Sequence, residues 1–364
     1  MGWNNINIVD GDGHVMEDWD AILEHMPDAY RTSSRFKGKG RLFPPLDHLH
    51  SGNLHQLVPG AFKQVGPEGW LEFMQDVGID RAVLYTTGGL AVGKVINGDF
   101  AIAICRAYND WFSDTYLQGS SLFQGLGLIP MQEPAEAVSE LRRIVEDLGF
   151  CGAMLPSTGL KGHLGSKEYW PVYAEADRLG CAIAVHGGAH EGLGMDCLVP
   201  YAPINGLGHP FGQMVCFASF VFNGLFDRFP NMRVGFMEGG VAWLQMCLER
   251  FDRGWETHIQ HDPRSEFIQL GKDESVSDHI TRHADEGRIF VGCEGTEQTL
   301  HQVIECIGNK PFMFSSDFPH EVNNEYCKHE ISEIFDNEHL TDDDKHAVLH
   351  GNAERFYGLN PQGL

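Results

Sequence analysis

Short apolar segments alternate with longer amphipathic segments along almost the whole chain. Eight of the apolar segments have the length and the near-continuous hydrophobicity of strands that are buried on both faces. We predict these strands at Ile6–Asp10, Arg81–Tyr85, Phe123–Ile129, Cys151–Leu155, Cys181–His186, Arg233–Glu238, Arg288–Cys293 and Pro311–Ser316. Strands of this kind, separated by helical segments, indicate an α/β fold with a parallel sheet.

The segments between the predicted strands have the spacing of amphipathic helices. Residues 134–148 carry apolar side chains at positions three and four apart, which predicts a helix there. Gly78, Gly149 and Gly180 each stand just before a predicted strand, where a glycine commonly ends the preceding helix. Eight such β-then-α units predict a (β/α)8 TIM barrel, with a doubly wound open sheet as the alternative.

Two long segments interrupt this regular order. Residues 25–75 follow the first predicted strand and are rich in glycine, proline and histidine, and residues 187–230 follow the fifth. Long loops at such junctions are where barrels build their pockets. We therefore interpret residues 1–364 as a single barrel domain with insertions at 25–75 and 187–230.

Charge and cysteine content narrow the class of protein. The net charge of −25 argues against nucleic acid and anionic membranes as partners, since both require basic patches. The 9 cysteines form no CxxC pair, which favours a reducing compartment over a disulfide framework. Asp10 and Asp12 stand where a signal peptide would be apolar, and no run of 18 apolar residues occurs, so we expect a cytoplasmic enzyme.

Candidate metal ligands stand where four predicted strands end. The residues in question are Asp10, Asp12, His14 and Glu17 after the first strand, His186 at the fifth, Glu238 at the sixth, and Asp317, His320 and Glu321 after the eighth. In a barrel these ends converge at one mouth, and imidazoles with carboxylates there make a site for Zn²⁺, Mn²⁺ or Fe²⁺. Taken singly, His186 could be a core histidine, Asp10 a turn cap, and Glu238 the partner of an arginine.

The chain resembles the amidohydrolase-related family, a branch of the amidohydrolase superfamily with hydrolases, decarboxylases and some non-heme iron oxygenases. The resemblance rests on the aspartate-rich opening, His186, the block FDRFPNMRVGFMEGGVAWLQMCLERFD, SSDFPH and the closing GNAERFYGL. It implies that Asp12, His14, His186 and Asp317 bind metal. The departure is Glu238, in EGG, where the family's decarboxylases and many of its hydrolases carry a histidine in HGG.

A glutamate at that position favours an additional metal ion. Glu17, His209 and His320 add enough donors for a second ion, which carboxylates would bridge and neutralise. We predict the metal ligands Asp12, His14, Glu17, His186, His209, Glu238, Asp317 and His320. We expect Asp317, Glu238 and His320 to be the catalytic residues, with no separate organic cofactor.

Three functions remain open from the sequence. The favoured one is a dinuclear non-heme iron (Fe/Fe or Fe/Mn) monooxygenase that hydroxylates a small organic substrate with O₂. The alternative is a mononuclear Zn- or Mn-dependent hydrolase or decarboxylase, in which the metal lowers the pKa of water toward 7. The third is a barrel without catalysis that serves as a partner subunit. We also expect a homo-oligomer or a pairing with a related subunit.

Overall fold

The computed structural model describes residues 3, 6–33, 36, 41–46, 59–258 and 261–359, so residues 47–58 of the first predicted insertion lie outside it. Eight parallel strands form a sheet in which each strand pairs with the next along the chain. They are β1 Val9–Val15, β2 Arg81–Thr86, β3 Phe123–Leu128, β4 Gly152–Pro156, β5 Ala182–His186, β6 Arg233–Met237, β7 Ile289–Cys293 and β8 Phe312–Phe314.

Hydrogen bonds between the first strand and the residues just after the last strand bring the sheet back on itself. Asp317 N donates to Asp12 O at 2.9 Å, and His14 N donates to Phe318 O at 2.7 Å. Asp10 adds a side-chain link, because its carboxylate accepts from Ser316 N at 2.9 Å and from Ser316 Oγ at 2.6 Å. The predicted (β/α)8 barrel is therefore confirmed, and the open sheet is not.

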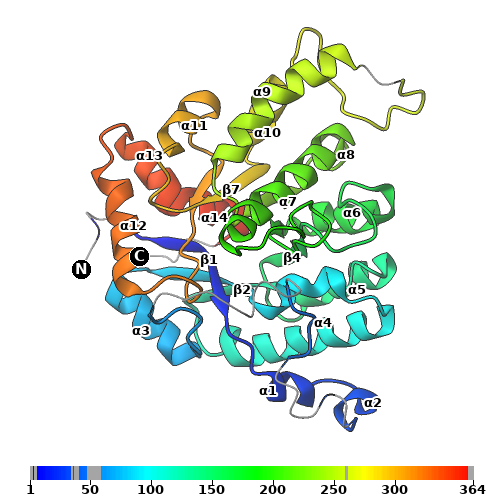
Figure 1. The fold of residues 1–364 in the computed structure, drawn as a ribbon, viewed down its shortest axis with the longest axis vertical. Helices are drawn as coiled ribbons and strands as arrows, with labels where there is room; N and C mark the ends of the chain where they lie inside the picture. The colour runs from blue at the N-terminus through cyan, green and yellow to red at the C-terminus, as the bar shows by residue number, and fades with distance from the viewer. Residues whose placement is uncertain are drawn as a thin grey trace.

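Helices surround the strands, which lie at the centre of Figure 1. The main ones are α3 Pro67–Val77, α4 Gly98–Phe112, α5 Pro134–Glu146, α6 Trp170–Leu179, α7 Ala202–Phe222, α9 Ala242–Thr257, α10 Val276–Asp285, α11 Leu300–Ile307 and α12 Asn324–Asp336. Shorter ones are α1 Trp19–Glu24, α2 Asp28–Arg31, α8 Leu225–Arg228, α13 Asp342–His346, α14 Asn352–Tyr357, and the 3₁₀ segment η1 Gly88–Lys94. No helix in the described part of the chain combines the length and apolar character needed to cross a membrane.

Two of the three glycines predicted to end helices do so, whereas α5 ends at Glu146 with Asp147 as its C-cap, before Gly149. Gly78 ends α3 and Gly180 ends α6, both in the left-handed conformation that a residue without Cβ adopts at low cost. The second predicted insertion is mostly helical, because α7 begins at Ala202 and continues through Pro210 to Phe222. The insertion thus supplies the helix that connects β5 to β6.

The first strand differs from its prediction. It runs over Val9–Val15 rather than Ile6–Asp10, so Asp12 and His14 lie within the strand instead of after it. A register shift between Asp10 and Gly13 interrupts the alternation of side chains, so Asp12 and His14 share the barrel-interior face while the Asp10 carboxylate lies on the side of Gly13. The glycines between them let the strand approach its neighbours closely. A Cβ on Gly11 would be 2.9 Å from Phe314 O, and one on Gly13 would collide with the Trp70 ring.

Candidate metal centre

Six polar side chains gather inside the mouth of the barrel, at the carboxyl ends of its strands. We call them the mouth group: Asp12, His14, His186, Glu238, Asp317 and His320. Asp12, His14 and His186 are buried almost completely, and the Glu238 and Asp317 side chains are 17% and 15% exposed. The sequence-predicted residues from the first, fifth, sixth and eighth strands therefore do lie together.

Two members of the mouth group have a strained backbone. Glu238 and Asp317, each just beyond the end of a strand, both have φ of 54°. That left-handed conformation is uncommon for residues other than glycine, and it persists only where the surroundings hold it. Strain at two strand ends that face the same point is typical of a functional site rather than of a packing feature.

The donor atoms lie at the separations expected around a metal ion. Asp12 Oδ1 is 3.5 Å from His14 Nε2, and Asp12 Oδ2 is 3.4 Å from His186 Nε2. Asp317 Oδ1 is 3.2 Å from His14 Nε2. Ligands held about 2.0–2.2 Å from one ion lie roughly 3.0–3.5 Å from each other, depending on coordination number.

Backbone carbonyls fix which ring nitrogen of two histidines faces the mouth group. His14 Nδ1 is 2.7 Å from Thr86 O, and His186 Nδ1 is 3.1 Å from Gly187 O. A carbonyl can only accept, so each Nδ1 carries the hydrogen and each Nε2 presents a lone pair to the carboxylates. Histidine ligands are commonly oriented by a hydrogen bond of this kind from the other ring nitrogen.

These lone pairs make the mouth group fit a divalent cation. Within the described residues, both oxygens of Asp12 and the Nε2 atoms of His14 and His186 are buried without a hydrogen-bond partner. Buried acceptors that face one another repel unless a cation or a proton lies between them. Two imidazoles with two carboxylates are a donor set that suits Zn²⁺, Mn²⁺ or Fe²⁺.

Burial also shifts the acidities in the mouth group. Burial raises the pKa of Asp12 to about 8 and lowers those of His186 and His320 to about 4. Burial, with the charges of Asp317 and Asp12, raises the pKa of Glu238 well above its usual range. For Asp317 burial acts in the same direction, but His320 and His14 outweigh it and lower the pKa. A cation would oppose the protonation of Asp12.

Glu17 lies apart from the mouth group, against the prediction that it is a ligand. Its carboxylate accepts hydrogen bonds from Thr86 Oγ1 at 2.5 Å, Thr87 N at 3.0 Å and Gly88 N at 2.8 Å. The chain turns beyond Val15 and directs Glu17 to the N–H groups at the start of η1. It reaches the site only indirectly, since Thr87 Oγ1 lies 3.0 Å from His320 Nε2.

His209 and a residue that the sequence did not single out come from α7. His209 Nε2 lies 3.6 Å from Glu238 Oε1, at the edge of the mouth group. Gln213 is completely buried, and its Nε2 donates to Val185 O at 3.1 Å and to Met237 O at 2.7 Å. It thereby fixes the residues just before His186 and Glu238. The signal was a glutamine in an otherwise apolar helical segment, which is weak without the structure.

A cavity of about 330 Å³ opens beside the mouth group and is strongly acidic. Among the described residues, its lining includes no lysine or arginine. It includes five carboxylates, those of Glu238, Glu294, Asp317, Glu321 and Glu330. The volume suits a small organic molecule. Any negative charge on a substrate would need a cation other than a side chain in this cavity.

Comparison with known proteins places the chain among relatives of similar length. The model of the family described as Amidohydrolase matches residues 9–359. A 2-amino-3-carboxymuconate-6-semialdehyde decarboxylase from Dictyostelium discoideum is 24% identical, over 87% of this chain and 85% of its own. A gamma-resorcylate decarboxylase from Rhodococcus jostii is 26% identical, over 80% and 87%.

Solved structures have the same fold. An amidohydrolase from Mycobacterium avium subsp. paratuberculosis superimposes with a TM-score of 0.75 at 18% identity, covering 97% of this chain and 100% of its own. A 5-carboxyvanillate decarboxylase from Novosphingobium aromaticivorans, determined with bound manganese, has a TM-score of 0.71 at 16% identity, with 99% of each chain covered.

Proposed function

The chain belongs to the amidohydrolase family, and from that premise we propose that it is a metal-dependent decarboxylase acting on a small organic carboxylate. The observation that carries the proposal is the set of buried acceptors at the mouth. The carboxylate oxygens of Asp12 and the Nε2 atoms of His14 and His186 face one another and are buried without a hydrogen-bond partner. A site that fits a cation supports metal-dependent decarboxylation, because relatives in the same family are decarboxylases.

The relatives favour the alternative that the sequence left open over its first choice. Those similar to this chain in sequence include the muconate semialdehyde and gamma-resorcylate decarboxylases. The preference for an iron monooxygenase rested on Glu238 and finds no support among them. Manganese in the structure of the 5-carboxyvanillate decarboxylase supports Mn²⁺ over iron as the ion of this site.

Asp12, His14, His186 and Asp317 would hold the ion. A bound Mn²⁺ or Zn²⁺ supplies the positive charge that attracts the substrate and stabilises electron density developing on it. Because the cavity lining described here has five carboxylates and no basic side chain, the substrate carboxylate depends on that charge for its attraction. The part of the substrate away from its carboxylate would be positioned by the shape of the cavity and by uncharged contacts.

Glu238 is the proposed proton carrier. Decarboxylation breaks a carbon–carbon bond and leaves the electron pair on the substrate carbon, which then takes up one proton. Burial and two neighbouring carboxylates raise the pKa of Glu238, which favours its protonated form. Glu238 would thus replace the histidine that the family resemblance implies.

Asp317 and His320 would orient the reacting groups. His320 Nδ1 lies 2.8 Å from Asp317 Oδ1, and Thr87 Oγ1 lies 3.0 Å from His320 Nε2. The lowered pKa of His320 keeps its ring neutral near pH 7, so Nδ1–H donates to Asp317 and Nε2 accepts from Thr87. These contacts from Thr87 through His320 hold the Asp317 carboxylate in a single orientation.

The test is an assay of the metal-depleted and reloaded protein. The protein is treated with a chelator, reloaded with Mn²⁺ or Zn²⁺, and given carboxylated phenols such as 2,6-dihydroxybenzoate and 5-carboxyvanillate. We expect metal-dependent CO₂ release and, in D₂O, one deuterium in the product at the carbon that lost the carboxylate. Loss of substrate with O₂ consumption and no CO₂ would contradict the proposal.

One observation bears on a second candidate, the dinuclear iron oxygenase. The donor atoms form two sets that share His14, one of Asp12, His14 and His186 and another of His14, Glu238, Asp317 and His320. His14 offers a single lone pair, on Nε2, so a second ion would be held by Glu238, Asp317 and His320, with Glu238 ionised. Two ions per mouth with substrate-dependent O₂ uptake would support this candidate, and one ion without O₂ uptake would exclude it.

A further inference from the structure

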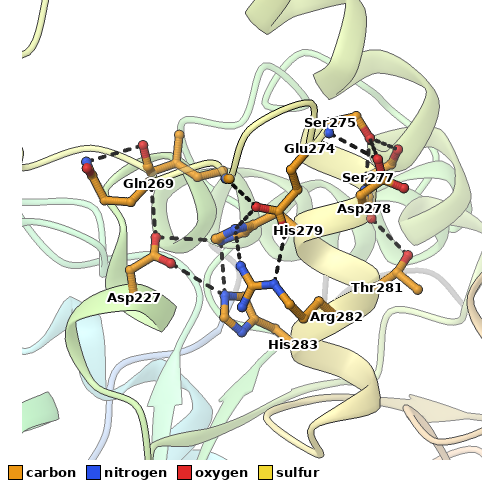
Figure 2. A network of polar contacts seen from close by, with 12 residues as sticks. Asp227, Gln269, Glu274, Ser275, Ser277, Asp278, His279, Thr281, Arg282 and His283 are labelled. Atoms are coloured by element: carbon orange, nitrogen blue, oxygen red, sulfur yellow. Dashed lines mark hydrogen bonds and ion pairs between the residues drawn. The ribbon is translucent and has the colours of Figure 1, made fainter.

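A second cluster of metal-binding side chains lies outside the barrel (Figure 2). We propose that Asp227, His279 and His283 form a structural Zn²⁺ site that links α8 to α10. We call these three residues the α8–α10 group. His279 and His283 are one turn apart on α10, so their side chains share one face. Asp227 lies on α8 and points toward both rings (Figure 2).

The α8–α10 group is remote from the mouth. The helix α8 precedes β6, and α10 leads through residues 286–288 into β7. Both therefore approach the amino ends of their strands, whereas the mouth group lies at the carboxyl ends. Features at the amino-terminal face of such barrels contribute to stability rather than to catalysis. An ion here would join two neighbouring β/α units.

The three donor atoms have the spacing of ligands around zinc. The Nε2 atoms of His279 and His283 are 3.1 Å apart. Asp227 Oδ2 is 3.6 Å from His279 Nε2, and Asp227 Oδ1 is 3.7 Å from His283 Nε2. Three ligands at about 2.0–2.1 Å from a tetrahedral ion lie roughly 3.3 Å from one another, so little movement would be needed.

Burial leaves the histidines ready to bind metal. The His279 and His283 side chains are 1% and 2% exposed, while that of Asp227 is 20% exposed. A buried pair of imidazoles with one carboxylate suits Zn²⁺, and the exposed side of Asp227 leaves the fourth position open to water.

Without a cation, the two rings take part in a hydrogen-bonded network with the side chains around them. Arg282 Nη2 lies 3.0 Å from His279 Nδ1, and an arginine only donates, so His279 Nε2 carries the ring hydrogen. That hydrogen faces His283 Nε2 at 3.1 Å, while His283 Nδ1 lies 3.2 Å from Glu286 Oε2. Arg288 Nη2 contacts both nitrogens of the His283 ring.

Zinc would replace the contact between the two Nε2 atoms, and acceptors for the ring hydrogens are already in place. The ion takes both Nε2 lone pairs, which moves the ring hydrogens to Nδ1. Glu286 Oε2 lies 3.2 Å from His283 Nδ1, and Glu274 Oε2 lies 3.9 Å from His279 Nδ1. A carboxylate behind each ligating imidazole is the usual support for a zinc-bound histidine.

The nearby arginines are held by carboxylates and carbonyls. Arg282 Nε pairs with Glu274 Oε1 at 2.9 Å and Arg288 Nε lies 3.2 Å from Glu286 Oε2, while Arg288 Nη1 donates to Phe226 O at 2.8 Å and to Pro230 O at 3.0 Å. A guanidinium is planar, so each group would move as a unit away from its imidazole when the ion binds. The arginines also balance the negative charge of the surrounding carboxylates, so the ion would be bound for coordination and not for charge neutralisation alone.

The experiment compares zinc binding by the full chain and by three variants. His279→Gln and His283→Gln remove a ligand while keeping a polar side chain. His329→Gln is the matched control, because His329 is 56% exposed on α12 and pairs only at 3.7 Å with Glu333 one turn away. Each protein is stripped with a chelator, exposed to Zn²⁺ and dialysed. Zinc per chain is then measured by elemental analysis, and thermal unfolding is followed with and without zinc.

We expect wild type and His329→Gln to hold one zinc ion per chain more than the two α10 variants. We also expect zinc to raise their Tm by a few degrees more than it raises that of the variants. The same difference of one ion should persist in an Asp317→Asn background, which separates the α8–α10 group from the mouth. Equal zinc content and equal Tm shifts in all four proteins would overturn the proposal.

Asp227→Asn tests the site if the buried substitutions prevent folding. Asp227 is partly exposed, and an asparagine oxygen can still accept the 3.1 Å hydrogen bond from Gln269 N. We expect this variant to fold and to bind zinc at least tenfold more weakly than wild type. Unchanged zinc affinity would contradict the proposal, because zinc would then bind somewhere other than the α8–α10 group. The cluster would in that case be a hydrogen-bonded network without metal.

Discussion

The mouth group and the α8–α10 group consist of the same residue types, but their charge environments differ. The cavity beside the mouth has five carboxylates in its lining and no basic residue among those described. The α8–α10 group is flanked by Arg282 and Arg288. On the proposed functions, a cation at the mouth would both balance charge and act on a substrate, whereas an ion at α8–α10 would only connect two helices. Similar ligands would then serve chemistry in one place and stability in the other.

The largest effect is expected at the eighth strand end. Asp317→Asn removes an anionic oxygen that lies 3.2 Å from His14 Nε2 and 2.8 Å from His320 Nδ1. We expect kcat/KM to fall by about 10²–10⁴-fold, with a Tm within a few degrees of wild type. Steady-state kinetics on the Mn²⁺-loaded protein measures this. Glu325→Gln, at a carboxylate that is 86% exposed on α12, is the matched control and should leave activity unchanged.

Substitutions at Glu238 distinguish a mouth that holds one metal ion from a mouth that holds two. Glu238→Gln cannot deliver a proton, so we expect about 10²-fold lower kcat with an unchanged content of tightly bound metal. Glu238→His restores a group that exchanges protons near neutral pH and should keep kcat within about tenfold of wild type. If both variants instead lose a metal ion along with O₂ uptake, Glu238 is a ligand in a dinuclear site.

The barrel strands at the mouth depend on a buried amide. Gln213→Leu leaves the carbonyl oxygens of Val185 and Met237 without their donor, at 3.1 Å and 2.7 Å in the native chain. We expect the free energy of unfolding to fall by about 1–3 kcal/mol, because a buried acceptor without a partner costs its desolvation. Chemical denaturation measures this loss. A stability equal to that of wild type would show that the amide does not hold β5 and β6 together.

The smallest effect is expected at the residue that orients His320. Thr87→Val keeps the shape of the side chain but removes the hydroxyl that lies 3.0 Å from His320 Nε2. We expect kcat to fall roughly three- to tenfold, as for the loss of one hydrogen bond of about 1 kcal/mol, with little change in Tm. A Tm loss of the same size as that of Gln213→Leu would instead assign Thr87 to packing.

The sequence was informative where the periodicity of apolar residues, or the position of a residue relative to a strand, determines the structure. Near-continuous apolar runs and glycines before strands predicted the barrel, and polar residues at strand ends predicted most of the mouth group. The limits of β1 were wrong, because the alternation of aspartate and glycine hides a buried strand whose polar side chains face inward. Glu17 was misplaced for a related reason, since its direction depends on how the chain turns after Val15.

Contacts between distant segments were beyond the sequence. The left-handed conformations of Glu238 and Asp317 carry no local signature, because glycine and not an acidic residue is typical there. His279 and His283 have a visible helical spacing, but Asp227 is far from them in the chain and joins them only through packing of α8. Gln213 acts on two strands that its own helix connects, which only the folded barrel reveals.

The buried acceptors of the mouth group are proposed to hold a divalent cation that the reaction requires. One experiment measures metal per chain and CO₂ release together, during stepwise removal of metal by a chelator in the His283→Gln background. Activity should fall in proportion to the loss of one ion and return with Mn²⁺, while Asp317→Asn should neither retain that ion nor regain activity. Full CO₂ release from protein without metal would show that the reaction needs no cation at the mouth.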